Sequence, residues 1–300
     1  MREKIPVTII NWDSVEIVEL CIKYIRERTD PAKIDIQVVD NGSEDRGNIL
    51  RLLELKGSGD IERIIALPKN MGFSIAFNIA FEETVGDVFC YVSSDCLVEP
   101  GWFEEGMKSL EADANIAAVC SNIFLMEENR KLSENDENIE LSELYGAIMF
   151  IRRKARKAWL EVGCFDYLNF SPAYAEESDW SHRAKRKGYR IVLSGKSLAY
   201  HSESYTMKNK YNKNSLRLLR LTHRIKYRFL NWSYQEFLFN WKWYLIEVVE
   251  EIKNGTIHIL LAAIMKNLLM LSTTLEERKK RSKGQTIIFK YPYRNIATFI

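Results

Sequence analysis

The strongest constraint on the fold is a regular alternation of strand-like and helix-like segments over the first 120 residues. Short apolar runs rich in β-branched side chains predict strands at residues 5–10, 34–39, 61–67, 88–92 and 116–121. The segments between them, residues 14–28, 45–55, 73–83 and 102–112, place apolar residues at helical spacing. Strands that alternate with helices are typical of a parallel sheet covered by helices on both faces. We therefore predict a doubly wound α/β domain with a mostly parallel central sheet.

Polar turns follow four of the predicted strands, at residues 11–13, 40–43, 70–72 and 93–95. In an open α/β sheet, ligands bind just beyond the carboxyl ends of the strands. The four turns are therefore expected to converge on one site for a polar ligand. The plainer interpretation is that they only reverse the chain.

Two common phosphate-binding motifs are absent from the sequence. There is no GxGxxG after the first predicted strand and no GxxxxGK[ST] anywhere, which disfavours dinucleotide-binding dehydrogenases and P-loop NTPases. A divalent cation held by carboxylates is another common way to bind a phosphate, because hard cations prefer oxygen ligands.

The cysteines and the first residues indicate a reducing compartment. The five cysteines are odd in number and form no CxxC pair, which argues against a disulfide framework and against a cysteine zinc site. The chain begins with a strand-like run and without the pattern of a signal peptide. We expect a cytoplasmic protein.

Charge divides the chain near residue 204. Residues 205–300 contain 18 Lys and Arg against 6 Glu, whereas residues 1–204 contain 25 basic and 35 acidic residues. The acidic stretch 122–142 is expected to form a surface loop or hairpin, residues 176–187 a helix, and residues 190–193 and 197–201 short strands. From residue 214 the pattern is mostly helical, with a break at Gly255. We predict a domain at 1–204 and a basic, aromatic-rich helical region at 205–300.

Seven short blocks occur in order along the first domain. They are VVDNGS at 38–43, NMGF at 70–73 followed by Ala76 and Asn78, SSD at 93–95, GAIM at 146–149, GCFD at 163–166, EESDW at 176–180, and His201. In this order and spacing, the chain resembles the family-2 glycosyltransferases of the GT-A fold, and most closely their rhamnosyl- and galactofuranosyltransferase-like branch. The resemblance covers about residues 5–204. It implies an inverting, metal-assisted transferase that uses a nucleotide diphosphate sugar, with UDP or dTDP as the expected nucleotide.

The resemblance implies that Asp40 reads the base or ribose of the nucleotide. A carboxylate can accept two hydrogen bonds from one diol or imide edge. Asn70 and Gly72 open a predicted helix, whose N-terminal N–H groups favour phosphate, although an N-cap alone would explain both residues. The predicted nucleotide-binding residues are Asn11, Asp40, Asn41, Asn70, Gly72, Asn78 and Ser94.

The resemblance places Asp95 and His201 at a metal site. Ser93 occupies the position where the family's Asp-x-Asp motif often has its first acid, so it departs from the pattern. Asp95 can still bind Mg²⁺ or Mn²⁺ through oxygen, and an imidazole ligand favours Mn²⁺ somewhat. A single structural histidine is the alternative interpretation of His201.

The acidic block at residues 176–180 is expected to supply the general base. The resemblance gives this role to the second acid, Glu177, where the family usually has Asp. Glu176 is the second candidate, and Asp179 is expected to hold the loop or contact the acceptor. Neighbouring carboxylates raise one another's pKa, which suits a base. Acids are also favoured at helix N-termini for structural reasons alone.

Trp102 and Trp180 are candidate platforms for the sugar or acceptor. Aromatic rings can stack on the faces of pyranose rings, but most tryptophans are packed in the core.

The helical region predicts a membrane-associated setting. Residues 215–252 interleave Arg and Lys with Trp, Tyr, Phe and Leu, and residues 278–283 form a second basic cluster. This pattern is typical of helices that lie on an anionic membrane surface. Packing on the first domain or a homo-oligomer interface would also explain it. The region shows no RNA-binding motif, so no nucleic-acid partner is expected.

The sequence therefore favours a glycosyltransferase of cell-envelope polysaccharide biosynthesis, peripheral at the cytoplasmic face of the membrane. It would transfer sugar to a glycan or a lipid-linked acceptor. The main alternative is a non-catalytic nucleotide-sugar or glycan-binding protein on the same scaffold. A nucleotidyltransferase is disfavoured, because residues 9–13 do not form the Gly- and Arg/Lys-rich loop that such an enzyme needs.

Overall fold

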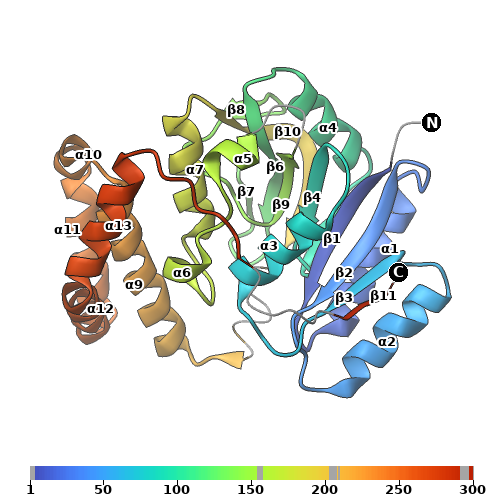
Figure 1. Ribbon diagram of the computed structural model, residues 1–300, viewed down its shortest axis with the longest axis horizontal. Helices are drawn as coiled ribbons and strands as arrows, with labels where there is room; N and C mark the ends of the chain where they lie inside the picture. Colours follow the sequence, from blue (N-terminus) through green and yellow to red (C-terminus); the bar gives the residue numbers. More distant parts are fainter. Residues whose placement is uncertain (1–3, 154–157, 203–207, 209, 291–296, 300) are drawn as a thin grey trace.

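The computed structural model describes residues 4–153, 158–202, 208, 210–290 and 297–299. A central twisted sheet carries helices on both faces, and a lobe of helices lies beside it (Figure 1). The predicted α/β class with a helical C-terminal extension is confirmed.

The first four strands of the predicted pattern form a parallel unit. Strands β3 (Arg63–Ala66), β2 (Ile34–Asp40), β1 (Ile5–Asn11) and β4 (Val88–Val92) lie side by side in this order, all parallel. The connecting helices are α1 (Val15–Arg28), α2 (Arg46–Gly57) and α3 (Phe73–Glu83). β1 and β2 are buried along most of their length, as expected for parallel strands covered on both faces.

The second half of the sheet is mixed. Strand β9 (Ile148–Arg152) lies between β4 and β6 (Ile116–Leu125) and is antiparallel to both. Strand β10 (Arg190–His201) runs parallel to β6, and β5 (Cys96–Val98) is antiparallel to β10. The two short strands predicted at 190–193 and 197–201 are thus one strand, with a register shift between Ser194 and Leu198. The acidic stretch contains two short strands, β7 (Arg130–Lys131) and β8 (Ile139–Glu140).

Two hydrophobic cores cover the two faces of the sheet. One contains Trp102 and Phe150 and lies beneath α1 and α4 (Trp102–Glu111). The other is an aromatic cluster beneath α3, α5 (Ala158–Val162) and α7 (Glu176–Arg186), in which Phe77 stacks on Phe165 at 4.4 Å between ring centroids. All five cysteines are free and buried.

The helical lobe has more breaks than the one predicted at Gly255. It comprises α9 (Lys213–Asn231), α10 (Tyr234–Phe239), α11 (Trp241–Lys253), α12 (Ile257–Leu269) and α13 (Leu271–Ser282). Within the described ranges, no single helix has the length and apolar composition of a membrane span, whereas α12 and α13, bent by 66° at their junction, meet that test as a pair.

The end of the chain returns from the helical lobe to the sheet. The Cys164 N–H donates to the Ile287 carbonyl at 3.0 Å, and strand β11 (Ala297–Phe299) adds antiparallel to β3 at the sheet edge (Figure 1). The division into residues 1–204 and 205–300 stays a prediction. The structure adds that the last described residues pack with the first segment.

Candidate functional site

Asp40 lies at the carboxyl end of β2, opposite Asn11 at the end of β1. Its carboxylate accepts hydrogen bonds from Asn11 Nδ2 at 2.8 Å and from the Ser43 hydroxyl at 2.6 Å through Oδ1, and from Ser43 N at 3.2 Å through Oδ2. Asn11 is fully buried, and its Oδ1 accepts from Ser14 N at 3.2 Å. The Asn11 side chain is enclosed by protein and holds Asp40 in place, and its contact with the nucleotide stays a prediction.

Asn41 and Asn70 link the end of β2 to the loop that precedes α3. Asn41 Nδ2 donates to Asn70 Oδ1 at 3.2 Å, and Asn41 Oδ1 accepts from Met71 N at 2.9 Å. Gly72 has φ +81, and a Cβ there would lie 2.8 Å from the Pro172 backbone. Phe73 N donates to the Pro172 carbonyl at 2.6 Å, so the first turn of α3 contacts the loop that precedes α7. Phosphate binding by Asn70 and Gly72 stays a prediction.

Asn78 does not face a ligand site. Its Nδ2 donates to the Phe165 carbonyl at 2.9 Å, and its Oδ1 accepts from Phe165 N at 3.1 Å. The side chain is fully buried. The prediction of nucleotide binding by Asn78 is wrong, because both ends of its amide join α3 to the GCFD segment.

Asp95 and His201 meet at the carboxyl ends of β4 and β10. Asp95 Oδ1 lies 3.1 Å from His201 Nε2, and both side chains are largely buried. The Ser93 hydroxyl donates to Asp95 Oδ1 at 2.6 Å. Ser93, the departure from the acidic motif, therefore orients the acid that remains. Ser94 is buried in the same turn, and its contact with the nucleotide stays a prediction.

This pair fits a divalent cation. Two ligand atoms at about 2.1 Å from one octahedral ion lie about 3 Å apart when adjacent, which agrees with the observed separation. Cys96 completes a cluster in which all three potential ligand atoms lie within 4.8 Å. The Cys96 thiol donates to the Ala147 carbonyl at 3.7 Å, and a soft sulfur is a poorer ligand than oxygen for Mg²⁺ or Mn²⁺. Asp95 and His201 are the ligands that the geometry favours.

Glu177 lies against the backbone that leads into β9. A Cβ added at Gly146 would lie only 2.2 Å from Glu177 Oε1, so the carboxylate occupies the space that glycine leaves open. The next residue, Ala147, accepts a hydrogen bond from Ser93 N at 2.7 Å through its carbonyl. Residues 146–147 thus separate the acidic block from the Asp95 turn. Burial raises the pKa of Glu177 to about 7, and the negative charge of Glu143 adds to this.

Glu176 is buried, and its Oε2 has no hydrogen-bond partner among the described residues. Burial, followed by the negative charge of Glu177, raises the pKa of Glu176 well above its ordinary value. Glu176 is enclosed by protein, whereas Glu177 is half-buried and lies against Gly146. Glu177 is therefore the better candidate for a base.

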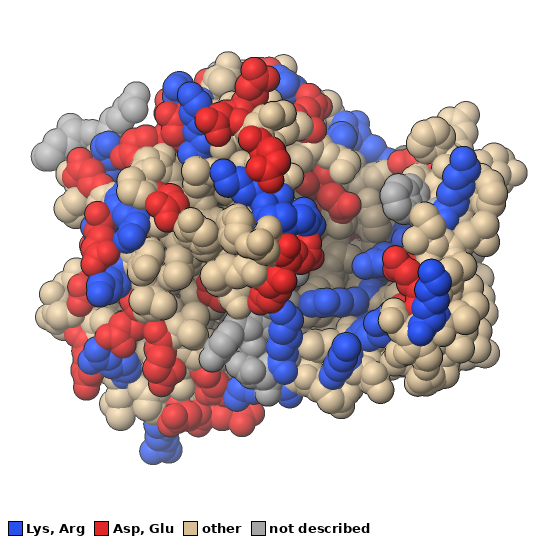
Figure 2. Space-filling model, turned by 180° about the vertical axis from the view of Figure 1, so that it is seen from behind, with Lys and Arg blue, Asp and Glu red and all other residues tan. Residues whose placement is uncertain are grey.

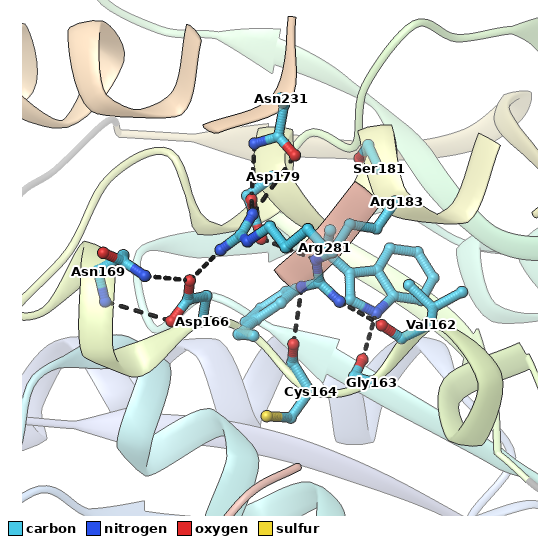
Figure 3. Close-up of polar contacts among 12 residues, drawn as sticks. Val162, Gly163, Cys164, Asp166, Asn169, Asp179, Ser181, Arg183, Asn231 and Arg281 are labelled. Atoms are coloured by element: carbon cyan, nitrogen blue, oxygen red, sulfur yellow. Dashed lines mark hydrogen bonds and ion pairs between the residues drawn. The ribbon is translucent and has the colours of Figure 1, made fainter. Parts of the chain in front are cut away.

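Asp179 is held by contacts with three described side chains (Figure 3). Its carboxylate pairs with Arg281 of α13, accepts from Arg183 Nε at 2.9 Å and accepts from Asn231 Nδ2 at 2.8 Å. Burial raises the pKa of Asp179, but the charges of Arg281 and Arg183 outweigh burial and bring that pKa down to about 2. Its side chain is fully buried. These contacts suit the expectation that Asp179 holds its segment in place, and a catalytic role or an acceptor contact stays a prediction.

Trp102 and Trp180 are not sugar platforms. Both are fully buried. Trp102 Nε1 donates to Thr29 Oγ1 at 2.8 Å, and Trp180 Nε1 donates to the Gly163 carbonyl at 2.9 Å. Each indole is packed in a core, so no ring face is open to a ligand.

Trp12 is a site residue that sequence reasoning missed. It follows Asn11 at the end of β1 and is half-buried, with Lys210 Nζ 5.4 Å from its ring centroid and the Tyr211 ring 6.2 Å away. Lys210 Nζ also donates to Asp13 Oδ2 at 2.7 Å. In the sequence, the feature that could have identified Trp12 is its aromatic side chain within the polar turn at residues 11–13.

The sequence matches the family model described as glycosyl transferase family 2 over residues 7–175. A curated relative, glycosyltransferase AglE of Haloferax volcanii, is 25% identical over 107 residues. That match covers 35% of this chain and 35% of the relative, so it spans about a third of the relative's length.

Solved glycosyltransferase structures share the fold. GalNAc-T7 with UDP, GalNAc and Mn²⁺ gives a TM-score of 0.63 at 14% identity, covering 79% of this chain and 49% of the other. The mannosyltransferase PcManGT from Pyrobaculum calidifontis, in complex with GDP-Man and Mn²⁺, gives 0.59 at 15% identity, covering 95% and 84%. S. aureus TarS with UDP-GlcNAc gives 0.55 at 17% identity, covering 78% and 68%.

The central sheet and its covering helices have the GT-A fold of these structures. Because the family model covers more than half of the chain, the protein belongs to glycosyl transferase family 2. The rhamnosyl- and galactofuranosyltransferase-like branch stays a prediction.

Proposed function

We propose that the protein is an inverting, metal-assisted glycosyltransferase that moves a sugar from a nucleotide diphosphate sugar to a hydroxyl of a glycan or lipid-linked acceptor. One observation carries the proposal. Glu177, with a pKa of about 7, and the Asp95–His201 pair lie on the two sides of residues 146–147 at one edge of the sheet.

The donor nucleotide would bind at the ends of β1 and β2. Asp40 offers a carboxylate that is already oriented by Asn11 and Ser43. Trp12 offers an aromatic side chain beside it, and Lys210 adds positive charge that suits a diphosphate. UDP or dTDP is the nucleotide proposed. The solved complexes include both UDP and GDP-Man, so they leave the base open.

Asp95 and His201 would hold Mn²⁺ or Mg²⁺, and both neighbouring complexes named with a metal contain Mn²⁺. When bound, the cation offsets the negative charge that develops on the leaving diphosphate. Ser93 keeps Asp95 in position through its hydrogen bond.

Glu177 would act as the general base. As the acceptor oxygen forms its bond to the anomeric carbon, the Glu177 carboxylate takes the proton of the acceptor hydroxyl. The bond from the anomeric carbon to the diphosphate oxygen breaks in the same step, and its electron pair leaves with the nucleotide. One displacement from the opposite face inverts the anomeric centre.

The test begins with calorimetric titration of the protein with UDP, dTDP and GDP, each with and without Mn²⁺. We expect metal-dependent binding of one nucleotide. Asp95→Asn should weaken that metal dependence, whereas Glu177→Gln should bind the nucleotide normally and lose turnover with the matching donor sugar. A folded protein that binds none of the three nucleotides would contradict the proposed donor class.

The cellular setting is part of the same proposal. The acceptor, a role in cell-envelope polysaccharide synthesis, and a peripheral position at the cytoplasmic membrane face are inferred from the basic, aromatic helical region. Self-association through that region is the competing arrangement.

A further inference from the structure

Helix α11 turns its acidic side inward and its apolar side outward. Glu247 and Glu251 are buried and accept hydrogen bonds from Arg228 at 2.8 Å and Arg217 at 2.7 Å, both on α9. The opposite side is an exposed apolar stripe at the spacing of one helix face: Trp241, Leu245, Val249 and Ile252. A surface helix in water has the reverse arrangement, with its apolar stripe on the core. The outward stripe of α11 is therefore suited to an apolar environment.

Helices α10 and α12 also expose apolar side chains, although the buried side of α12 is itself largely apolar, with Ile259, Leu260 and Ala263 in a small core. On α12 the buried side contains Asn267, whose Nδ2 donates to the Thr222 carbonyl of α9 at 3.0 Å. The outward side of α12 exposes Leu261, Met265 and Leu268, again at helical spacing. Helix α10 exposes Leu238 and Phe239. Three consecutive helices thus present apolar side chains to solvent.

The exposed stripes of α11 and α12 belong to one surface. A cavity of about 220 Å³ lies between α9, α10, α11 and α12. Val248, Ile264 and Leu268 line this cavity and are also exposed at its rim. The exposed apolar residues of α10, α11 and α12 form the apolar face. Figure 1 places these helices on the side of the lobe away from the sheet.

The charges around the apolar face indicate which kind of partner can bind there. The described residues of α10, α11 and α12 expose Lys242, Lys253 and Lys266 against two acids, Glu250 and the 41% exposed side chain of Glu236. Figure 2 shows the helical lobe with basic but few acidic side chains, in contrast to the mixed charges of the other lobe. Two copies of the chain meeting at this face would bring lysines together, which is unfavourable. Anionic lipid head groups complement the lysines.

We propose that the apolar face docks on an anionic phospholipid bilayer, with α10, α11 and α12 lying in its interfacial layer. The apolar stripes enter the acyl boundary, and the lysines reach the head groups through their long side chains. This inference deepens the proposed function, because it names the surface that would hold the catalytic domain beside a lipid-linked acceptor. Its test does not depend on turnover.

The experiment is sedimentation of the whole chain with vesicles of phosphatidylcholine, alone or mixed with phosphatidylglycerol. We expect binding to the mixed vesicles and weaker binding to the neutral ones. Leu245→Glu and Leu261→Glu should each reduce binding about tenfold, because each removes a leucine from the acyl boundary. Leu50→Glu is the matched control, since Leu50 on α2 is 59% exposed, as is Leu261. It should bind vesicles like the unaltered chain.

A second set of variants tests the charge. Replacing Lys242, Lys253 and Lys266 by Gln should reduce binding to the anionic vesicles by about fivefold per lysine, and change binding to neutral vesicles little. Equal binding by the leucine variants and the Leu50 control would overturn the proposal. The proposal would also be overturned if the chain did not bind vesicles but formed a dimer, and if Leu245→Glu converted that dimer to a monomer. Nucleotide titration of the same variants separates this outcome from failure of the donor site.

Discussion

Arg281 of α13 forms a buried ion pair with Asp179 of α7, although the two residues are 102 positions apart in the sequence. The same guanidinium pairs with Asp166, which caps α6 (Tyr167–Phe170). The helical lobe is therefore joined to the helix that carries Glu177, two residues before Asp179. Figure 3 shows Arg281 between the two carboxylates. The lobe that we place on the membrane thus supports the acidic block directly.

Removal of the Arg281 charge should destabilise the protein strongly. Arg281→Met would leave the buried carboxylates of Asp166 and Asp179 without their shared partner, and breaking a buried ion pair typically costs about 3–5 kcal/mol. Urea denaturation followed by circular dichroism measures the change. Arg278→Gln is the control, because Arg278 on the same helix donates to the Phe229 carbonyl at 2.7 Å, and the loss of one hydrogen bond costs about 1 kcal/mol. Equal losses for both variants would show that the Arg281 ion pairs contribute little.

The pH dependence of turnover should follow Glu177. Below its pKa of about 7 the carboxyl is protonated and cannot accept the acceptor proton, so kcat/KM should rise with pH through about 7 and level off above it. Glu177→Gln should lower kcat by about 10²–10⁴-fold and remove this rise. If kcat/KM of the unaltered protein stays constant from about pH 5 to about pH 8, the base is another group.

Gly146 should be required for the position of the base. A methyl group at Gly146 would lie 2.2 Å from Glu177 Oε1, so Gly146→Ala must displace that carboxylate. A misplaced base lowers kcat by as much as about a hundredfold, while binding of the nucleotide at the ends of β1 and β2 stays unchanged. Gly57→Ala is the control, because its added methyl group would have no neighbour within 4 Å. Steady-state kinetics with a nucleotide titration separates the two effects. Loss of nucleotide binding in Gly146→Ala would point to a wider rearrangement instead.

Sequence reasoning recovered the elements that local pattern determines. The first four strands and the helices between them were predicted within a few residues, because apolar periodicity reports burial directly. The insertion of β9 between β4 and β6 and the return of β11 to β3 were not predicted. Strand pairing depends on partners far away in the chain, which a periodic pattern does not specify.

The candidate site shows the same difference between features that local sequence predicts and features that depend on distant partners. Asp95 and His201 were predicted as partners and lie 3.1 Å apart, because both follow strands whose ends share one edge. Trp102, Trp180 and Asn78 were placed at the site by residue type, but their polar atoms bond inside the core. Arg281 was missed, since a basic cluster at the end of the chain gives no sign of which arginine is buried.

Ser93 should set the affinity for the metal. Its hydroxyl donates to Asp95 Oδ1 at 2.6 Å, and partners that orient a metal ligand typically contribute about 10–100-fold to metal affinity. Ser93→Ala should therefore weaken Mn²⁺ binding by that factor, measured by titration in the presence of UDP. Ser121→Ala is the control, because the hydroxyl of the buried Ser121 bonds to Ser197 at 2.7 Å and not to Asp95. Unchanged Mn²⁺ affinity in Ser93→Ala would mean that the backbone alone orients Asp95, and that the serine in the acidic motif has no part in holding the cation.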